Sequence, residues 1–147
     1  MQRFYLLSNV IFAIALLALG LVAIVKDYKL KLNQLFALFA LSISVWIIAA
    51  YISNDTANPE TVSLIGNYFV FLFSYIAACL LLMLSIILAE DKTAAHRLKY
   101  FYLPILIIGA LSASPLVVSD VHVQGTVYAV IFGPLAVLYG IGITTLS

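Results

Sequence analysis

Charged residues are scarce in this chain, with 7 Lys or Arg and 6 Asp or Glu among 147 residues. They make up 9% of the sequence, against about 25% in an ordinary soluble domain. All of them fall at the ends of long apolar segments or between such segments. This distribution excludes a water-soluble fold. A net charge of +1 without a basic stripe also gives no basis for a nucleic-acid partner.

Cysteine is nearly absent as well, since Cys79 is the single one and lies inside an apolar stretch. A disulfide framework and a cysteine metal site are therefore excluded. The apolar segments also hold no internal His, Asp, Glu, Lys or Arg. They therefore lack the side chains that catalysis within a membrane and proton-coupled transport require, and they lack a lysine that could bind retinal. We expect no enzyme activity, no cofactor and no metal. A metal site joining His122 and Asp120 to Asp55 and Glu60 is an alternative, but a loop histidine is usually solvated.

Long hydrophobic runs are what the sequence has in abundance, and they predict an all-α, polytopic transmembrane helix bundle. A membrane-spanning helix needs roughly 20 apolar residues. Five segments meet this length, at approximately residues 4–25, 33–53, 61–89, 98–118 and 126–146. A cleaved signal peptide is an alternative interpretation of the first segment. Its apolar run exceeds the roughly 7–15 residues of a signal core, so we interpret it as a retained span.

Basic residues predict the direction of these spans, because cytoplasmic loops are enriched in Lys and Arg. The connection after the first span and the connection after the third carry Lys26, Lys29, Lys31, Lys92, Arg97 and Lys99. The alternate connections, at 54–60 and 119–125, contain no Lys or Arg, which leaves only Arg3 on the other side. The N-terminus is therefore predicted to lie outside the cell.

Neutral polar and aromatic residues concentrate in the central and outer parts of the predicted spans. In the third span Asn67, Ser74 and Tyr75 recur at offsets of seven and eight and so share a helical face. One interpretation is hydrogen bonding between helices. The sharper hypothesis is an outward-opening pocket for a small neutral or amphipathic ligand, lined by Trp46, Asn67, Tyr68, Ser74 and Ser112.

The last predicted span contains Gly133 and Pro134 near its middle. A proline inside a helix removes a hydrogen bond, so a kink is expected there, either for packing or as a hinge that transmits a signal. Gly133, Ala136 and Gly140 form a small-residue stripe that would permit a homodimer. Because this span is barely finished at Ser147, we expect the chain to be truncated; a natural five-helix protein is the alternative.

Several motifs occur in a recognisable order along nearly the whole chain. They are Asn33 to Tyr51 with Trp46, the basic loop Lys92 to Arg97, Tyr102-Leu103-Pro104, the Gly125 turn, and Gly133-Pro134-Leu135 with Tyr139. Together with the predicted topology, this order resembles the N-terminal seven-transmembrane sensor region of bacterial histidine kinases. The resemblance covers about five of the seven helices, and no kinase motif is present.

The resemblance implies a sensor in the bacterial cytoplasmic membrane that signals to a histidine kinase of a two-component system or to a cyclic-dinucleotide synthase. We therefore predict a membrane-embedded receptor for a ligand or a membrane state. The main alternative is a non-catalytic membrane scaffold or a subunit of a larger membrane complex. Half of a transporter ranks last, because no charged residue lines a path through the spans.

Overall fold

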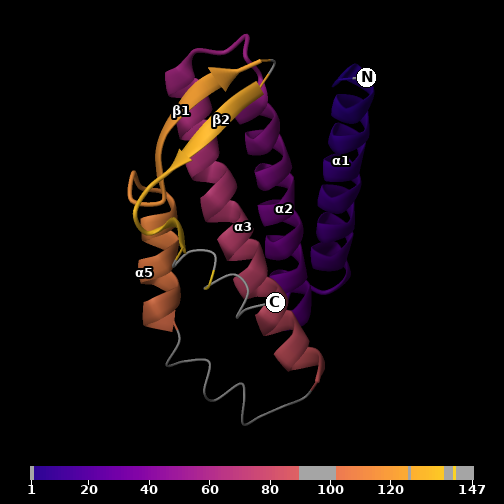
Figure 1. The fold of residues 1–147 in the computed structure, drawn as a ribbon. Coiled ribbons are helices and arrows are strands. Elements are labelled where there is room, and N and C mark those ends of the chain that lie inside the picture. Colours follow the sequence, from indigo (N-terminus) through magenta and orange to yellow (C-terminus); the bar gives the residue numbers. More distant parts are fainter. Residues whose placement is uncertain (1, 90–101, 126, 138–140, 142–147) are drawn as a thin grey trace.

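The computed structural model describes residues 2–89, 102–125, 127–137 and 141. Three long helices stand side by side, and a shorter helix and a β-hairpin lie against the third of them (Figure 1). The elements in chain order are α1 (Gln2–Lys26), α2 (Lys31–Asn54), α3 (Glu60–Leu88), α5 (Tyr102–Ser112), β1 (Val118–Gln124) and β2 (Val127–Phe132). The fold is thus mostly helical as predicted, but the all-α prediction did not include the hairpin.

Within the described residues, three helices are long and apolar enough to cross a membrane, at Ser8–Lys26, Lys31–Asn54 and Glu60–Leu88. The first three predicted spans are therefore confirmed as long apolar helices, close to their predicted bounds. Large apolar side chains cover the outer surface of these helices; Val25, for example, is 84% exposed. Such a surface suits lipid and is compatible with an integral membrane protein.

The fourth predicted span, 98–118, is shorter than expected in its described part. Helix α5 has 11 residues and ends at Ser112. At about 1.5 Å per residue it covers about 16 Å, roughly half of the hydrocarbon thickness. Residues 113–117 form a turn, and β1 begins at Val118. The predicted start of this span, 98–101, lies outside the described residues.

The fifth predicted span, 126–146, is wrong over residues 127–132, which form β2. This strand pairs antiparallel with β1, from Val118 opposite Phe132 to Gln124 opposite Val127. β-Branched and aromatic residues fill β2 and favour a strand. Gly125 adopts a φ of 66°, which a two-residue hairpin turn requires and which glycine adopts without strain. The remainder of this predicted span, at 138–140 and 142–146, lies outside the described residues.

The predicted mid-helix kink at Gly133 and Pro134 is also wrong, because the pair follows a strand. Helical structure begins only at Ala136, so Pro134 stands at a helix start, where its missing N–H costs little. The Gly133 N–H donates to the Val117 carbonyl oxygen at 2.9 Å. A Cβ on Gly133 would collide with the backbone carbonyl of Leu116. The two residues therefore fasten the base of the hairpin instead of bending a helix.

Helix α1 packs on α2 through small residues. A Cβ built on Gly20 would lie 3.1 Å from the Ala40 Cβ, so the two helices are in close contact. Nearby, the Ser44 hydroxyl shares its proton between the Ala13 carbonyl oxygen on α1, at 3.2 Å, and the Ala40 carbonyl oxygen on its own helix, at 2.8 Å. One fully buried hydroxyl thus bridges the two helices.

Replacing Ser44 by Ala is expected to lower the free energy of unfolding by about 0.6 kcal/mol, because an interhelical hydrogen bond is lost. Unfolding by dodecyl sulfate in mixed micelles, followed by circular dichroism, measures this change. Ser42→Ala is the matched control, since the buried Ser42 hydroxyl donates to the Leu38 carbonyl oxygen on its own helix. Equal losses in the two variants would show that the bridge to α1 does not stabilise the fold.

Candidate functional site

Asn67 belongs to a polar seam between α2 and α3, close to the 55–59 loop that connects them. Its side chain is buried, and its Nδ2 donates to the Ser63 carbonyl oxygen at 3.0 Å. The Ser63 hydroxyl donates in turn to the Ser53 carbonyl oxygen on α2. Gly66 faces Ser53 so closely that a Cβ on it would lie 2.9 Å from the Ser53 Cβ. The Ser63 hydroxyl thus links the two helices, whereas the Asn67 amide bonds within α3.

Tyr68 and Ser112 lie elsewhere, in the region where α3, α5 and the hairpin meet. Tyr68 packs against a buried cluster that consists of Tyr75, Cys79, Val117 and Val118. Ser112 is fully buried at the end of α5, where its hydroxyl donates to the Gly109 carbonyl oxygen at 2.6 Å. Both side chains therefore contribute to packing beneath the hairpin.

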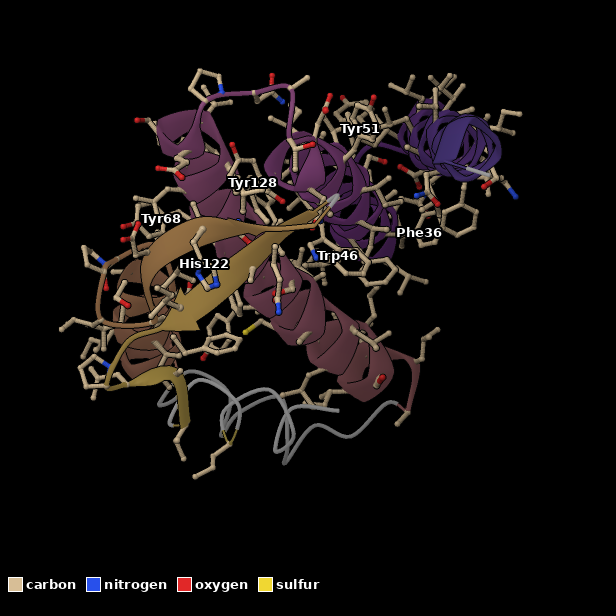
Figure 2. The ribbon with its side chains drawn as sticks, turned by 45° about the horizontal axis from the view of Figure 1, so that its top comes forward. Phe36, Trp46, Tyr51, Tyr68, His122 and Tyr128 are labelled. Atoms are coloured by element: carbon tan, nitrogen blue, oxygen red, sulfur yellow. The ribbon has the colours of Figure 1, made fainter. Side chains whose placement is uncertain are left out.

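Trp46 and Ser74 are the two predicted site residues that the structure brings together. They line a shallow groove of about 250 Å³ between α2 and α3, with Phe39, Ile43, Ala77, Ala78 and Leu81. The Ser74 hydroxyl donates to the Phe71 carbonyl oxygen at 3.0 Å. Figure 2 shows Trp46 and Tyr68 well apart. The five predicted residues thus occupy three places and do not form one pocket.

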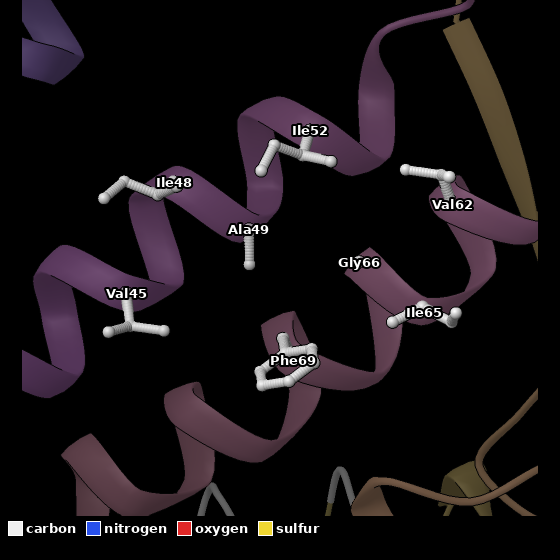
Figure 3. Close-up of a pocket in the computed structure, with 8 residues that line it drawn as sticks. All are labelled: Val45, Ile48, Ala49, Ile52, Val62, Ile65, Gly66 and Phe69. Atoms are coloured by element: carbon white, nitrogen blue, oxygen red, sulfur yellow. The ribbon is translucent and has the colours of Figure 1, made fainter. Parts of the chain in front are cut away.

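A larger groove, of about 360 Å³, was not predicted from the sequence. It lies between α2 and α3 nearer to their connecting loop and is lined by Val45, Ile48, Ala49, Ile52, Val62, Ile65, Gly66 and Phe69 (Figure 3). The small residues Ala49 and Gly66 lie between larger apolar side chains, which include Phe69. Its lining holds no titratable group and suits only apolar contacts, such as those of an acyl chain or another helix. Small residues facing each other on consecutive spans were the available sequence signal.

The hairpin is fastened to the 55–59 loop by Tyr128, which is only 6% exposed. Its hydroxyl donates to the Asn58 carbonyl oxygen at 2.7 Å. The Asn58 side-chain amide donates to the Ile52 carbonyl oxygen near the end of α2 at 3.1 Å. At the hairpin base, Phe132 meets Phe71 of α3 edge to face, with ring centroids 6.0 Å apart. The hairpin is therefore linked to both α2 and α3.

The opposite face of the hairpin is open. Asp120, His122 and Gln124 are exposed on β1, and Figure 2 shows His122 projecting from the ribbon. Within the described ranges no three His, Cys, Asp or Glu side chains come together as metal ligands would. Every buried side-chain polar atom in the same part of the chain has a hydrogen-bond partner. The candidate site is thus the hairpin with its attachment to α2 and α3 through Tyr128, Asn58 and the Phe132–Phe71 contact.

Comparisons with protein-family models, with curated proteins and with solved structures give no match.

Proposed function

We propose that the chain is a membrane-embedded sensor module that detects a ligand or a membrane state and signals to a cytoplasmic effector such as a histidine kinase. The observation that carries the proposal is the attachment of the hairpin to both neighbouring helices through Tyr128, Asn58 and the Phe132–Phe71 contact. A surface element joined to two spanning helices is a means of converting an external contact into a helix movement.

The hairpin is placed at the outer membrane surface in this proposal. A two-stranded sheet has an unpaired backbone edge on each strand, and unpaired backbone groups are too costly for the hydrocarbon. Figure 1 shows the N-terminus, the 55–59 loop and the hairpin turn at the same end of the bundle. The 27–30 turn between α1 and α2, flanked by lysines, lies at the other end, which the lysines assign to the cytoplasm.

Helix α3 supplies the connection between the two surfaces. Its 29 residues run without interruption from the hairpin contacts to the other end of the bundle, about 44 Å at 1.5 Å per residue. A sensor needs two arrangements of similar free energy, and a signal shifts the balance between them. Sliding or rotation of α3 under the hairpin would provide these two arrangements.

Replacing Tyr128 by Phe tests the coupling, because the change removes one hydroxyl and retains the ring. We expect amide hydrogen exchange in β1 and β2 to accelerate about fivefold, which corresponds to the loss of about one hydrogen bond. A sensor further predicts altered exchange at the 27–30 turn and at the end of α3, measured on the full chain in lipid nanodiscs. Tyr51→Phe, an exposed position on α2, is the control. A change confined to the hairpin would contradict the sensor proposal.

The alternative of a scaffold or subunit is favoured by one observation, the open apolar groove of Figure 3. A partner helix seated there would bury Ile48, Ile65 and Phe69, which are 46–49% exposed. Ile65→Trp would fill this groove. It is expected to abolish co-purification with a membrane partner if the chain is a subunit, and to leave exchange at the hairpin unchanged.

A further inference from the structure

We propose that the turn between α1 and α2 binds the phosphate headgroup of an anionic phospholipid. Residues 26–31 hold Lys26, Lys29 and Lys31 with a single acid, Asp27, so three positive charges and one negative give this segment a net charge of +2. All six residues of the segment are exposed. The proposal depends on the spanning helices and not on sensing, so it stands or falls separately from the sensor function.

The lysines are free to bind because other groups complete the turn. The Asp27 carboxylate accepts a hydrogen bond from the Lys29 backbone N–H at 2.9 Å. Side-chain amides from the first turn of α2 close the end of α1: Asn33 Nδ2 donates to the Asp27 carbonyl oxygen at 2.9 Å, and Gln34 Nε2 donates to the Tyr28 carbonyl oxygen at 2.7 Å. The carbonyl oxygens of Asp27 and Tyr28 are thus satisfied by side-chain amides and not by an ammonium group.

The three ammonium groups also have no acidic partner among the described residues. Lys29 makes a weak cation–π contact instead, with its Nζ 5.8 Å from the centre of the Tyr28 ring. The backbone of the turn is therefore held by hydrogen bonds, and its lysine side chains present a net positive charge. An anionic phosphate is the chemical group that complements it, and a zwitterionic headgroup does so less well because its own charges cancel.

The apolar surface of α1 continues directly into these lysines. Leu21, Val22 and Val25 are 64%, 63% and 84% exposed and lie within about one helical turn of one another. Tyr28 follows this surface directly and is 64% exposed. Tyrosine is enriched at the headgroup region of membranes, so this position suits it. One lipid can therefore place an acyl chain along α1 and its phosphate beside Lys26 and Lys29. The partner is a bilayer lipid for this reason, and not a soluble polyanion.

The test uses the full chain in nanodiscs that contain equal amounts of phosphatidylglycerol and phosphatidylcholine. Native mass spectrometry then counts the lipids of each kind that remain bound after release. Each lysine near an anionic surface favours binding by about fivefold, so the triple variant Lys26→Gln, Lys29→Gln, Lys31→Gln is expected to lose at least about fivefold of its preference for phosphatidylglycerol. The second basic segment, 92–99, is identical in all variants.

Two further variants make the result specific. Replacing all three lysines by Arg keeps the charge and is expected to keep the preference. Asp55→Asn with Glu60→Gln removes charge at the opposite end of α2 and α3 and is also expected to leave the preference intact. Retention of the wild-type preference by the Gln variant overturns the proposal. Loss of it in the Arg variant, with its circular dichroism unchanged, equally overturns charge as the basis of binding.

Discussion

Gly133→Ala is expected to detach the hairpin base and to lower the free energy of unfolding by about 3 kcal/mol. The added Cβ would collide with the carbonyl groups of Pro115 and Leu116, which are backbone and cannot rotate away. Two hydrogen bonds would be displaced with it, from Gly133 N–H to Val117 and from Leu135 N–H to Leu116. Dodecyl sulfate unfolding measures the loss, and amide exchange in β1 locates it.

Pro134→Ala is the control for this prediction and also tests the corrected position of the pair. At a helix start, replacing proline changes stability by only about 0.5 kcal/mol. Within a helix, the same change would restore a hydrogen bond and stabilise the protein by up to about 3 kcal/mol. A clear gain in stability from Pro134→Ala would therefore contradict the hairpin and support the mid-helix kink.

The second large effect is expected from Gly66→Ala, which acts on the contact between α2 and α3. Its Cβ would lie 2.9 Å from the Ser53 Cβ and 3.1 Å from the Ser53 Cα, so the two helices would have to separate. Overpacking of this kind costs about 2 kcal/mol, despite the better helix propensity of alanine. The same unfolding measurement applies, and exchange at the Ser63 and Asn67 amides should rise with it.

Gly109→Ala is the matched control, since Gly109 also lies in a helix but has room for a methyl group. The nearest atom to its added Cβ is the Tyr75 Cδ1 at 3.8 Å, an ordinary contact. Here alanine is expected to be neutral or to stabilise by about 0.5 kcal/mol. If both variants behaved alike, the close approach at Ser53 would not matter to stability.

The three long helices could be predicted from the sequence because uninterrupted apolar runs between charged residues leave few alternatives in lipid. The hairpin was missed because the apolar run Val127–Phe132 is consistent both with a strand and with part of a spanning helix. The decisive signal lay in β1, where Val121 and Val123 alternate with Asp120, His122 and Gln124 ahead of Gly125. An alternating strand followed by a turn glycine predicts a hairpin.

The candidate site was harder to predict because burial of a polar residue does not reveal its partner. Asn67 and Ser112 are buried, as polar residues of a helix interface would be, yet both bond to carbonyl oxygens three or four residues earlier on their own helices. A sequence cannot distinguish this local bond from a bond to a ligand. Trp46 and Ser74 meet only because α2 and α3 pack at one particular register, which small residues such as Gly66 determine through the backbone.

The bond between Tyr128 and Asn58 also has a consequence for the order of assembly. It joins positions 70 residues apart, so it cannot form until the ribosome has synthesised the whole of α1, α2, α3, α5 and β1. Contacts between residues so distant in sequence form late, after local helices are complete. During synthesis the 55–59 loop therefore lacks this contact until β2 has been made and has paired with β1.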